Sequence, residues 1–280
     1  MRIPFFDYKR LYTDQRDELL KIFDSVCASG SFIMQKELKS FEHNLATYNK
    51  CNYSIGVANA TDGLELITNS IGLKKGDEII CSSHTMLATA SSIKLAGATP
   101  VPVDIGHDNL IDPKAIESAI NKNTVGIMPT QLNGRTCDME SIQNIADKYK
   151  LFIIEDSAQA LGSKFKGQFA GTFGYAGVFS FYPAKTLGSL GDAGAVVTNK
   201  IEFFEKIYQM HDHGRDINGE VKSWGRNSRL DNLQAAILDH KLKSYDEVIM
   251  RRRDIARIYY ENLKGIHQIK LPPSPDSDIN

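Results

Sequence analysis

Two charged residues that each follow an apolar run could perform chemistry together in this sequence. Asp156 stands two positions after the apolar run 151–154, and Lys185 lies shortly after the β-prone run 176–181. Pyridoxal 5′-phosphate (PLP) chemistry needs such a pair. The lysine amine joins the cofactor as a Schiff base, and the carboxylate keeps the ring nitrogen protonated so that the ring can accept electrons. A lone lysine in a loop is usually only solvated, but the pair in this order indicates a PLP site.

The segment 58–63 contains small residues that could bind the phosphate of such a cofactor. It lies between a predicted strand and a predicted helix, where free N–H groups and the helix dipole favour an anion. Ala60 and Thr61 are therefore candidate phosphate ligands, although Thr61 or Asp62 could equally be an ordinary helix cap. Ser180, just upstream of the lysine, could offer its hydroxyl to the same phosphate or simply bond to the backbone.

The hydrophobic pattern predicts the elements that must position these residues. Short apolar runs alternate with amphipathic stretches, so we expect an α/β fold with a mostly parallel sheet covered by helices on both faces. Ligands of such sheets bind beyond the carboxyl ends of the strands, where the lysine and the aspartate are both predicted to lie. The predicted strands are 54–57, 78–81, 99–103, 125–129, 151–154, 176–181 and 195–198, and the predicted helices are 13–28, 35–49, 63–72, 86–96, 112–121, 139–149, 201–211 and one long helix over 231–264.

Composition excludes several classes of protein. The 280 residues include 33 Lys and Arg against 34 Asp and Glu, and this balance gives no reason to expect a nucleic-acid partner. The four cysteines form no CxxC pair, so neither a metal site nor a disulfide framework is expected. No signal peptide or membrane-spanning run is evident, and we expect a cytoplasmic protein without a membrane partner.

The chain resembles the DegT/DnrJ/EryC1/StrS family of PLP-dependent sugar aminotransferases, which have the aspartate-aminotransferase fold (PLP fold type I). Within this family, the sequence most resembles the branch of dTDP-3-amino-3,6-dideoxyhexose transaminases. The resemblance covers nearly the whole chain. The most specific matching stretches are 180–185, 191–199 and 227–236, and further matches are 30–32 with 41–42, 60–64, 96–101 and 155–160.

The resemblance implies a role for each candidate residue of the cofactor site. Lys185 would form the Schiff base and shuttle the proton, and Asp156 would pair with the ring nitrogen. Gln159, which in isolation would be interpreted as helix surface, would lie near the ring oxygen. The phosphate would be bound by three residues, namely Ala60, Thr61 and Ser180.

A further motif implies a homodimer with shared active sites. Asn227 matches the asparagine that reaches the phosphate of the neighbouring subunit's cofactor. Arg229 of the same motif is a candidate for substrate contact, and anchoring of the turn is the alternative.

The sequence departs from the family at Met86, where members usually place an aromatic side chain over the cofactor ring. The polarizable sulfur of methionine could still cover the ring. His84 is a nearby candidate for substrate contact, with an ordinary loop histidine as the alternative.

The resemblance also predicts two domains. Residues 1–230 would form the PLP-binding large domain, and 231–280 would form a long interdomain helix and the start of a small C-terminal domain. Residues 271–280 are predicted to be a loop with no element after it, so we expect the small domain to be truncated. A non-catalytic remnant that acts by dimerisation or regulation is therefore an alternative to an active enzyme.

The implied reaction moves an amino group from L-glutamate to a nucleotide-linked keto sugar. The segment 182–194 looks like the branch that acts on 3-keto sugars, so a dTDP-3-keto-6-deoxyhexose destined for an O-antigen or another glycan is the expected acceptor. Amination of a 4-keto sugar is the alternative. Sugar dehydratases of the family replace the lysine with histidine, and Lys185 disfavours that reaction. The basic run 251–253 could meet a nucleotide diphosphate, although a solvated helix face is the ordinary state of such a run.

Overall fold

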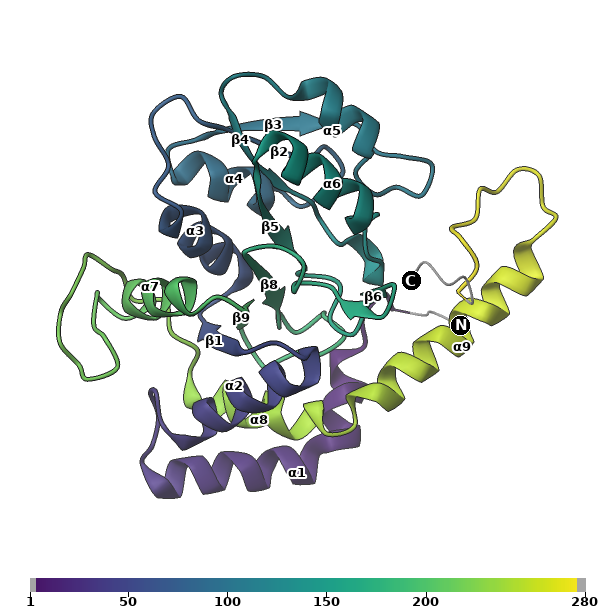
Figure 1. The fold of residues 1–280 in the computed structure, drawn as a ribbon. Coiled ribbons are helices and arrows are strands. Elements are labelled where there is room, and N and C mark those ends of the chain that lie inside the picture. Colours follow the sequence, from purple (N-terminus) through teal and green to yellow (C-terminus); the bar gives the residue numbers. More distant parts are fainter. Residues whose placement is uncertain (1–3, 276–280) are drawn as a thin grey trace.

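A seven-stranded sheet forms the centre of the protein, whose structure is a computed structural model that describes residues 4–275 (Figure 1). The strand order is β1-β9-β8-β5-β4-β2-β3. β9 is antiparallel to both of its neighbours, and the other pairs are parallel, so the prediction of a mostly parallel sheet is confirmed. The strands are β1 (Tyr53–Val57), β2 (Glu78–Ser82), β3 (Thr99–Val103), β4 (Thr124–Met128), β5 (Phe152–Asp156), β8 (Ala176–Ser180) and β9 (Gly194–Thr198).

Helices cover both faces of the sheet because its central strands are apolar on both sides. All five residues of β5 and of β9 are buried, as expected for strands without a solvent-facing side. One face packs against α3 (Ala60–Ser70), α4 (Leu87–Leu95) and α7 (Ile201–His211). The other packs against α2 (Lys36–Asn49), α5 (Pro113–Ala119), α6 (Met139–Tyr149) and α8 (Asn232–Leu242).

The predicted long helix over 231–264 is wrong, because the chain forms two helices there. α8 ends at Leu242, and α9 (Tyr245–Leu263) begins after Ser244, whose φ of −111° and ψ of 16° leave the helical region. The ring of Tyr245 is buried, and its hydroxyl bonds to Thr186 and to the carbonyl of Leu161. This tertiary anchor fixes the break, after which α9 leaves the body of the protein (Figure 1).

Most other predicted elements occur with small shifts at their ends. α1 (Tyr8–Ser29) begins earlier than predicted, because the side chain of Asp7 accepts the N–H of Arg10 and caps the helix. The pattern missed the hairpin of β6 (Lys164–Phe165) and β7 (Gln168–Phe169), whose strands are too short to show alternation, and the 3₁₀ turn η1 (Leu132–Gly134). Of the predicted loop 271–280, residues 276–280 lie outside the described part.

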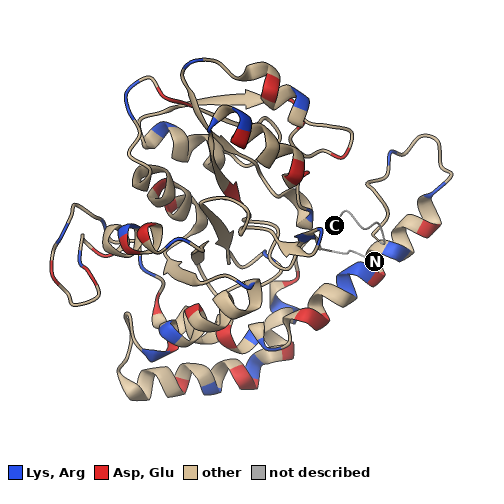
Figure 2. Cartoon of the chain, viewed as in Figure 1, with Lys and Arg blue, Asp and Glu red and all other residues tan. Residues whose placement is uncertain are grey.

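Charge is mixed over the surface. In the view of Figure 2, basic and acidic residues alternate along α1 and α9. Between residues 4 and 275, no helix combines the length and the apolar character needed to cross a membrane.

Close packing in β8 gives a test of this fold. A Cβ atom on Gly177 would lie 2.4 Å from the Cα of Gly171 and 2.5 Å from its carbonyl oxygen, so Gly177→Ala must displace backbone. We expect this variant to lose about 1–3 kcal/mol of the free energy of unfolding, measured by urea denaturation. Gly191→Ala is the matched control, since the nearest atom would lie at an ordinary 3.6 Å, and it should change stability by less than about 0.5 kcal/mol. Equal stability of the two variants would contradict the packing.

Candidate active site

Asp156 and Lys185 meet at the carboxyl edge of the sheet, as predicted. Asp156 ends β5 and is 3% exposed, and half-buried Lys185 follows β8 in a turn closed by its N–H and the carbonyl of Tyr182, 2.8 Å apart. Burial lowers the pKa of Lys185, and the attraction of Asp156 opposes this shift in part. Burial also raises the pKa of Asp156, against hydrogen bonds from Thr89 and Ala158 and the charge of Lys185. A cation placed against Asp156 would favour its ionised form.

The start of α3 provides backbone N–H groups for an anion. Its cap is Asn59, whose side chain accepts the N–H of Asp62 at 2.8 Å, so the prediction of Thr61 or Asp62 as the cap is wrong. The helix begins at Ala60, earlier than the sequence pattern indicates. The N–H groups of Ala60 and Thr61 therefore belong to the first turn, where no intrahelical carbonyl can accept them.

Gly194 brings Ser180 next to this helix start. In the sheet, Gly194 pairs with Ser180 at the end of β8 and with Val57 at the end of β1. A Cβ atom on Gly194 would lie 2.7 Å from the amide nitrogen of Ala60. The missing side chain thus lets the strand pair that carries Ser180 approach the start of α3 closely, as a phosphate site shared by the two would require.

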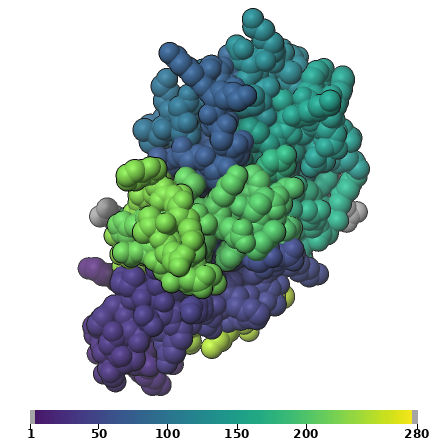
Figure 3. All heavy atoms as spheres, turned by 60° about the vertical axis from the view of Figure 1, so that its left-hand side comes forward, coloured from purple at the N-terminus to yellow at the C-terminus, as the bar shows by residue number. Residues whose placement is uncertain are grey.

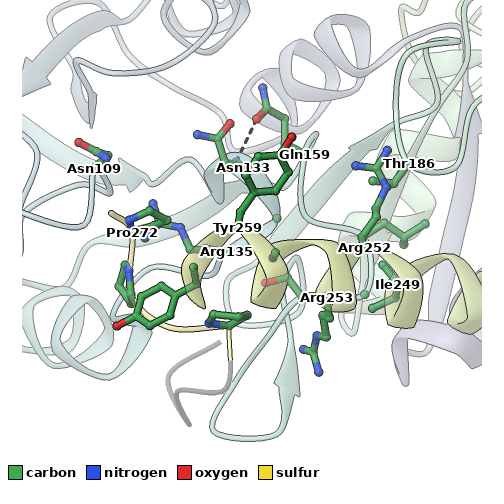
Figure 4. Close-up of a pocket in the computed structure, with 18 of the residues that line it drawn as sticks. Asn109, Asn133, Arg135, Gln159, Thr186, Ile249, Arg252, Arg253, Tyr259 and Pro272 are labelled. Carbon is green, nitrogen blue, oxygen red and sulfur yellow. Dashed lines mark hydrogen bonds between the residues drawn. The ribbon is translucent and has the colours of Figure 1, made fainter. Parts of the chain in front are cut away.

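Lys185 is one of the residues that line a cavity of about 1200 Å³. Figure 4 shows other residues of its wall. Gln159 also lines it, and the side-chain oxygen of Gln159 accepts the N–H of Asn133 at 3.0 Å. Asp156 and the candidate phosphate ligands Ala60, Thr61 and Ser180 do not line this cavity. Sequence reasoning missed several of its members. Arg135 and Tyr259 come from distant elements, and Tyr182 and Thr186, although next to Lys185 in the chain, have side chains that gave no signal of a site.

Three arginines line the cavity and give it a positive wall. Arg252 extends from α9 toward Thr186, whereas Arg253 points away from it (Figure 4). The Arg135 guanidinium donates to the carbonyl of Asp108, and its Nη1 is buried without a hydrogen-bond partner among the described residues.

The remaining predicted residues lie outside the cavity. Met86 is 64% exposed, and its sulfur accepts the N–H of Ala88 at 3.0 Å at the start of α4. His84 is exposed, with Nδ1 3.3 Å from the carbonyl oxygen of Asn109. Asn227 is exposed on the loop after α7, which forms a bulge on the surface between α1 and the part that carries α3 and α4 (Figure 3). Arg229 pairs with Asp212 at 3.0 Å, a contact that anchors this loop.

Glu155 is a buried carboxylate that the sequence did not mark as important. It accepts the N–H groups of Gly171, Phe173 and Gly174 at 2.6–3.0 Å and the side-chain amide of Gln131 at 2.8 Å.

In residues 4–275, no three His, Cys, Asp or Glu side chains gather in a way that could hold a metal ion.

The DegT/DnrJ/EryC1/StrS aminotransferase family matches the chain over residues 13–279. The chain belongs to this family. The dTDP-3-amino-3,6-dideoxy-alpha-D-galactopyranose transaminase of Aneurinibacillus thermoaerophilus is 44% identical over 276 residues, which cover 98% of this chain and 76% of the relative. The dTDP-3-amino-3,4,6-trideoxy-alpha-D-glucose transaminase of Streptomyces venezuelae is 37% identical over 279 residues, which cover 99% of this chain and 74% of the relative.

A solved structure shares the fold. The Bacillus subtilis protein NtdA, crystallised with bound cofactor PMP, superposes with a TM-score of 0.90 at 33% identity, and the match covers 99% of this chain and 65% of NtdA. The predicted PLP aminotransferase fold is therefore confirmed. The family is one of PLP-dependent aminotransferases, so this family member is an aminotransferase with PLP as its cofactor.

The lowered pKa of Lys185 predicts its reactivity in the cofactor-free protein. An amine reacts with acetic anhydride only when it is deprotonated, so Lys185 should reach half-maximal labelling at a lower pH than exposed Lys122 in the same sample. Asp156→Asn removes the attraction that holds the pKa up and should lower that midpoint further. Mass spectrometry of the labelled peptides measures both midpoints. A midpoint for Lys185 at or above that of Lys122 would contradict the burial of its amine.

Proposed function

We propose that this enzyme transfers an amino group from L-glutamate to a dTDP-linked 3-keto-6-deoxyhexose. The observation that carries the proposal is the position of Lys185, which lies near the buried carboxylate of Asp156 and lines a cavity with arginines on its wall. Both relatives described above are named for dTDP-linked 3-amino sugars, which supports the acceptor.

The residues of the site have the chemistry to hold PLP. Lys185 would carry the cofactor, Asp156 would pair with its ring nitrogen, and Gln159 would lie near the ring oxygen. The phosphate would lie in the cup formed by Ala60, Thr61 and Ser180, while Met86 would lie over the ring. When bound, PLP supplies an electron-accepting ring that stabilises negative charge on the carbon that loses a proton.

Lys185 would then act as the group that moves the proton. Its pKa is lowered by burial, so at a given pH a larger fraction of its free amine is deprotonated, and therefore able to accept a proton, than for a lysine with an ordinary pKa. Asp156, buried at the end of β5, would hold its negative charge against the ring nitrogen for the whole reaction.

The charge of the cavity wall supports a substrate that carries two anionic groups, such as a diphosphate. Arginine recognises phosphate through paired N–H groups, and Arg135 and Arg252, which both line the cavity, would meet a diphosphate there. His84 and Arg229 are weaker candidates for substrate contact, because His84 bonds to a backbone carbonyl and Arg229 bonds to Asp212.

Incubation with defined substrates tests the reaction. With L-glutamate and a panel of 3-keto and 4-keto dTDP- and UDP-sugars, we expect 2-oxoglutarate and a dTDP-3-amino sugar in equal amounts, identified by NMR. Lys185→Ala should lower the rate by about 10²–10⁴-fold through loss of the proton-transfer group. Lys122→Ala, which changes an exposed lysine between α5 and β4, should leave the rate unchanged.

Two outcomes would overturn parts of this proposal. Amination of 4-keto acceptors alone would assign the enzyme to C4 chemistry. A protein that binds PLP yet converts neither glutamate nor any acceptor would favour the non-catalytic alternative for this chain, which spans about three quarters of the two curated relatives.

We further propose a homodimer in which Asn227 completes the partner's phosphate site. Its exposure on a surface loop, where a second subunit can reach it, supports this role. Asn227→Ala and Lys185→Ala should each be nearly inactive. After subunit exchange in an equal mixture, half of the dimers carry one intact site, so activity should return to about a quarter of wild type. No recovery in hybrids whose exchange is verified by mass spectrometry would rule out shared sites.

A further inference from the structure

Three threonine hydroxyls form a chain that ends on Asp156. The hydroxyl oxygen of Thr89 lies 2.6 Å from Oδ2 of Asp156. The hydroxyl of Thr85 lies 2.7 Å from that of Thr89 and 3.0 Å from that of Thr130. Thr89 is 0% exposed and Thr130 5%, whereas Thr85 is partly exposed, so the bond from Thr89 to Asp156 is the one that is shielded from water.

The acceptor at the end of the chain sets the direction of every bond. An ionised carboxylate only accepts, so Thr89 must donate its single hydroxyl proton to Asp156. Thr89 can then only accept from Thr85, and Thr85 in turn can only accept from Thr130. All three dipoles thus point toward the carboxylate, and bonds aligned in this way strengthen one another.

The chain joins the elements that surround Asp156. Thr89 lies in the first turn of α4, and Thr130 follows β4 and pairs with Asp156 across a parallel bridge. The other carboxylate oxygen, Oδ1, accepts the N–H of Ala158 at 3.2 Å. One donor on each oxygen fixes the plane of the carboxylate, and each oxygen keeps a further lone pair.

Few charges face this carboxylate. Lys185 is the cation that acts on it among the described residues, and neighbouring Glu155 bonds to groups on the opposite side of β5. The hydroxyl chain therefore stabilises the ionised form of Asp156 in addition to the attraction of Lys185.

We propose that Thr89 is a positioning residue that fixes Asp156 and stabilises its ionised form, so that the ring nitrogen of bound PLP stays protonated. This inference rests on the PLP site proposed above. Thr85 and Thr130 act through Thr89, and their contributions should be smaller.

Removal of the hydroxyl gives a spectroscopic test. In Thr89→Val the carboxylate loses its shortest donor, and the ring nitrogen holds its proton less firmly. With less positive charge on the ring, the protonated nitrogen that joins the cofactor to Lys185 becomes a weaker acid. The pH midpoint of the cofactor's absorbance change should therefore rise by about one unit, and the Kd for PLP should rise about tenfold.

Matched variants separate this role from simple packing. Thr89→Ser keeps the hydroxyl and should restore both values, and Thr85→Val should shift both in the same direction by a smaller amount. Thr68→Val is the control, since Thr68 is equally buried in α3 and its hydroxyl bonds only to the carbonyl of Leu64. It should leave both values unchanged.

The outcomes distinguish this inference from the proposed reaction. Wild-type midpoint and affinity in folded Thr89→Val would overturn the role of Thr89, whatever the substrate. If Thr89→Val fails to fold, unchanged values in Thr85→Val would overturn it instead. Failure to aminate any sugar, together with shifted midpoints in these variants, would sink the proposed reaction and leave the role of Thr89 standing.

Discussion

Two adjacent carboxylates at the buried end of β5 impose the constraint on which the site depends. Successive side chains of a strand point to opposite faces, so Glu155 and Asp156 must be satisfied by different parts of the chain. Burial raises the pKa of both, and a buried charge without hydrogen bonds would be very costly. Backbone N–H groups of Gly171, Phe173 and Gly174 serve one carboxylate, and Thr89 serves the other.

The hydrogen bonds that Glu155 and Asp156 require fix the positions of the surrounding segments before a ligand binds. The turn before β8 is held by Glu155, and β8 in turn leads to Ser180 and Lys185. On the other face, α4 is tied to Asp156 and packs next to α3, whose first turn belongs to the proposed phosphate site. The two sides of the site are thus linked through one pair of neighbouring residues, which is the arrangement that preorganisation requires.

Sequence predicted the strands and the site edge well, because strands buried on both faces appear as continuous apolar runs and parallel strands end at the same edge. The pairing of Asp156 with Lys185 followed from that rule. Features fixed by tertiary contacts could not be predicted from the sequence. The break before Tyr245 depends on the hydrogen bonds of its hydroxyl, and the cap at Asn59 depends on where the helix starts. The hydroxyl of Thr89 gave no signal either, since a threonine in a helix usually bonds within that helix.

The antiparallel direction of β9 has a consequence for Lys185. Because β9 returns beside β8 without a crossover helix, the segment between them is a closed loop. Ser180 pairs with Gly194 at its mouth, and the N–H of Phe181 donates to Ala193 at 2.8 Å. Within the loop, Ser189 bonds back to the carbonyl of Phe181 through its N–H and its hydroxyl. An amine on so short a tether keeps a high effective concentration at the reacting carbon even when no covalent bond holds it there.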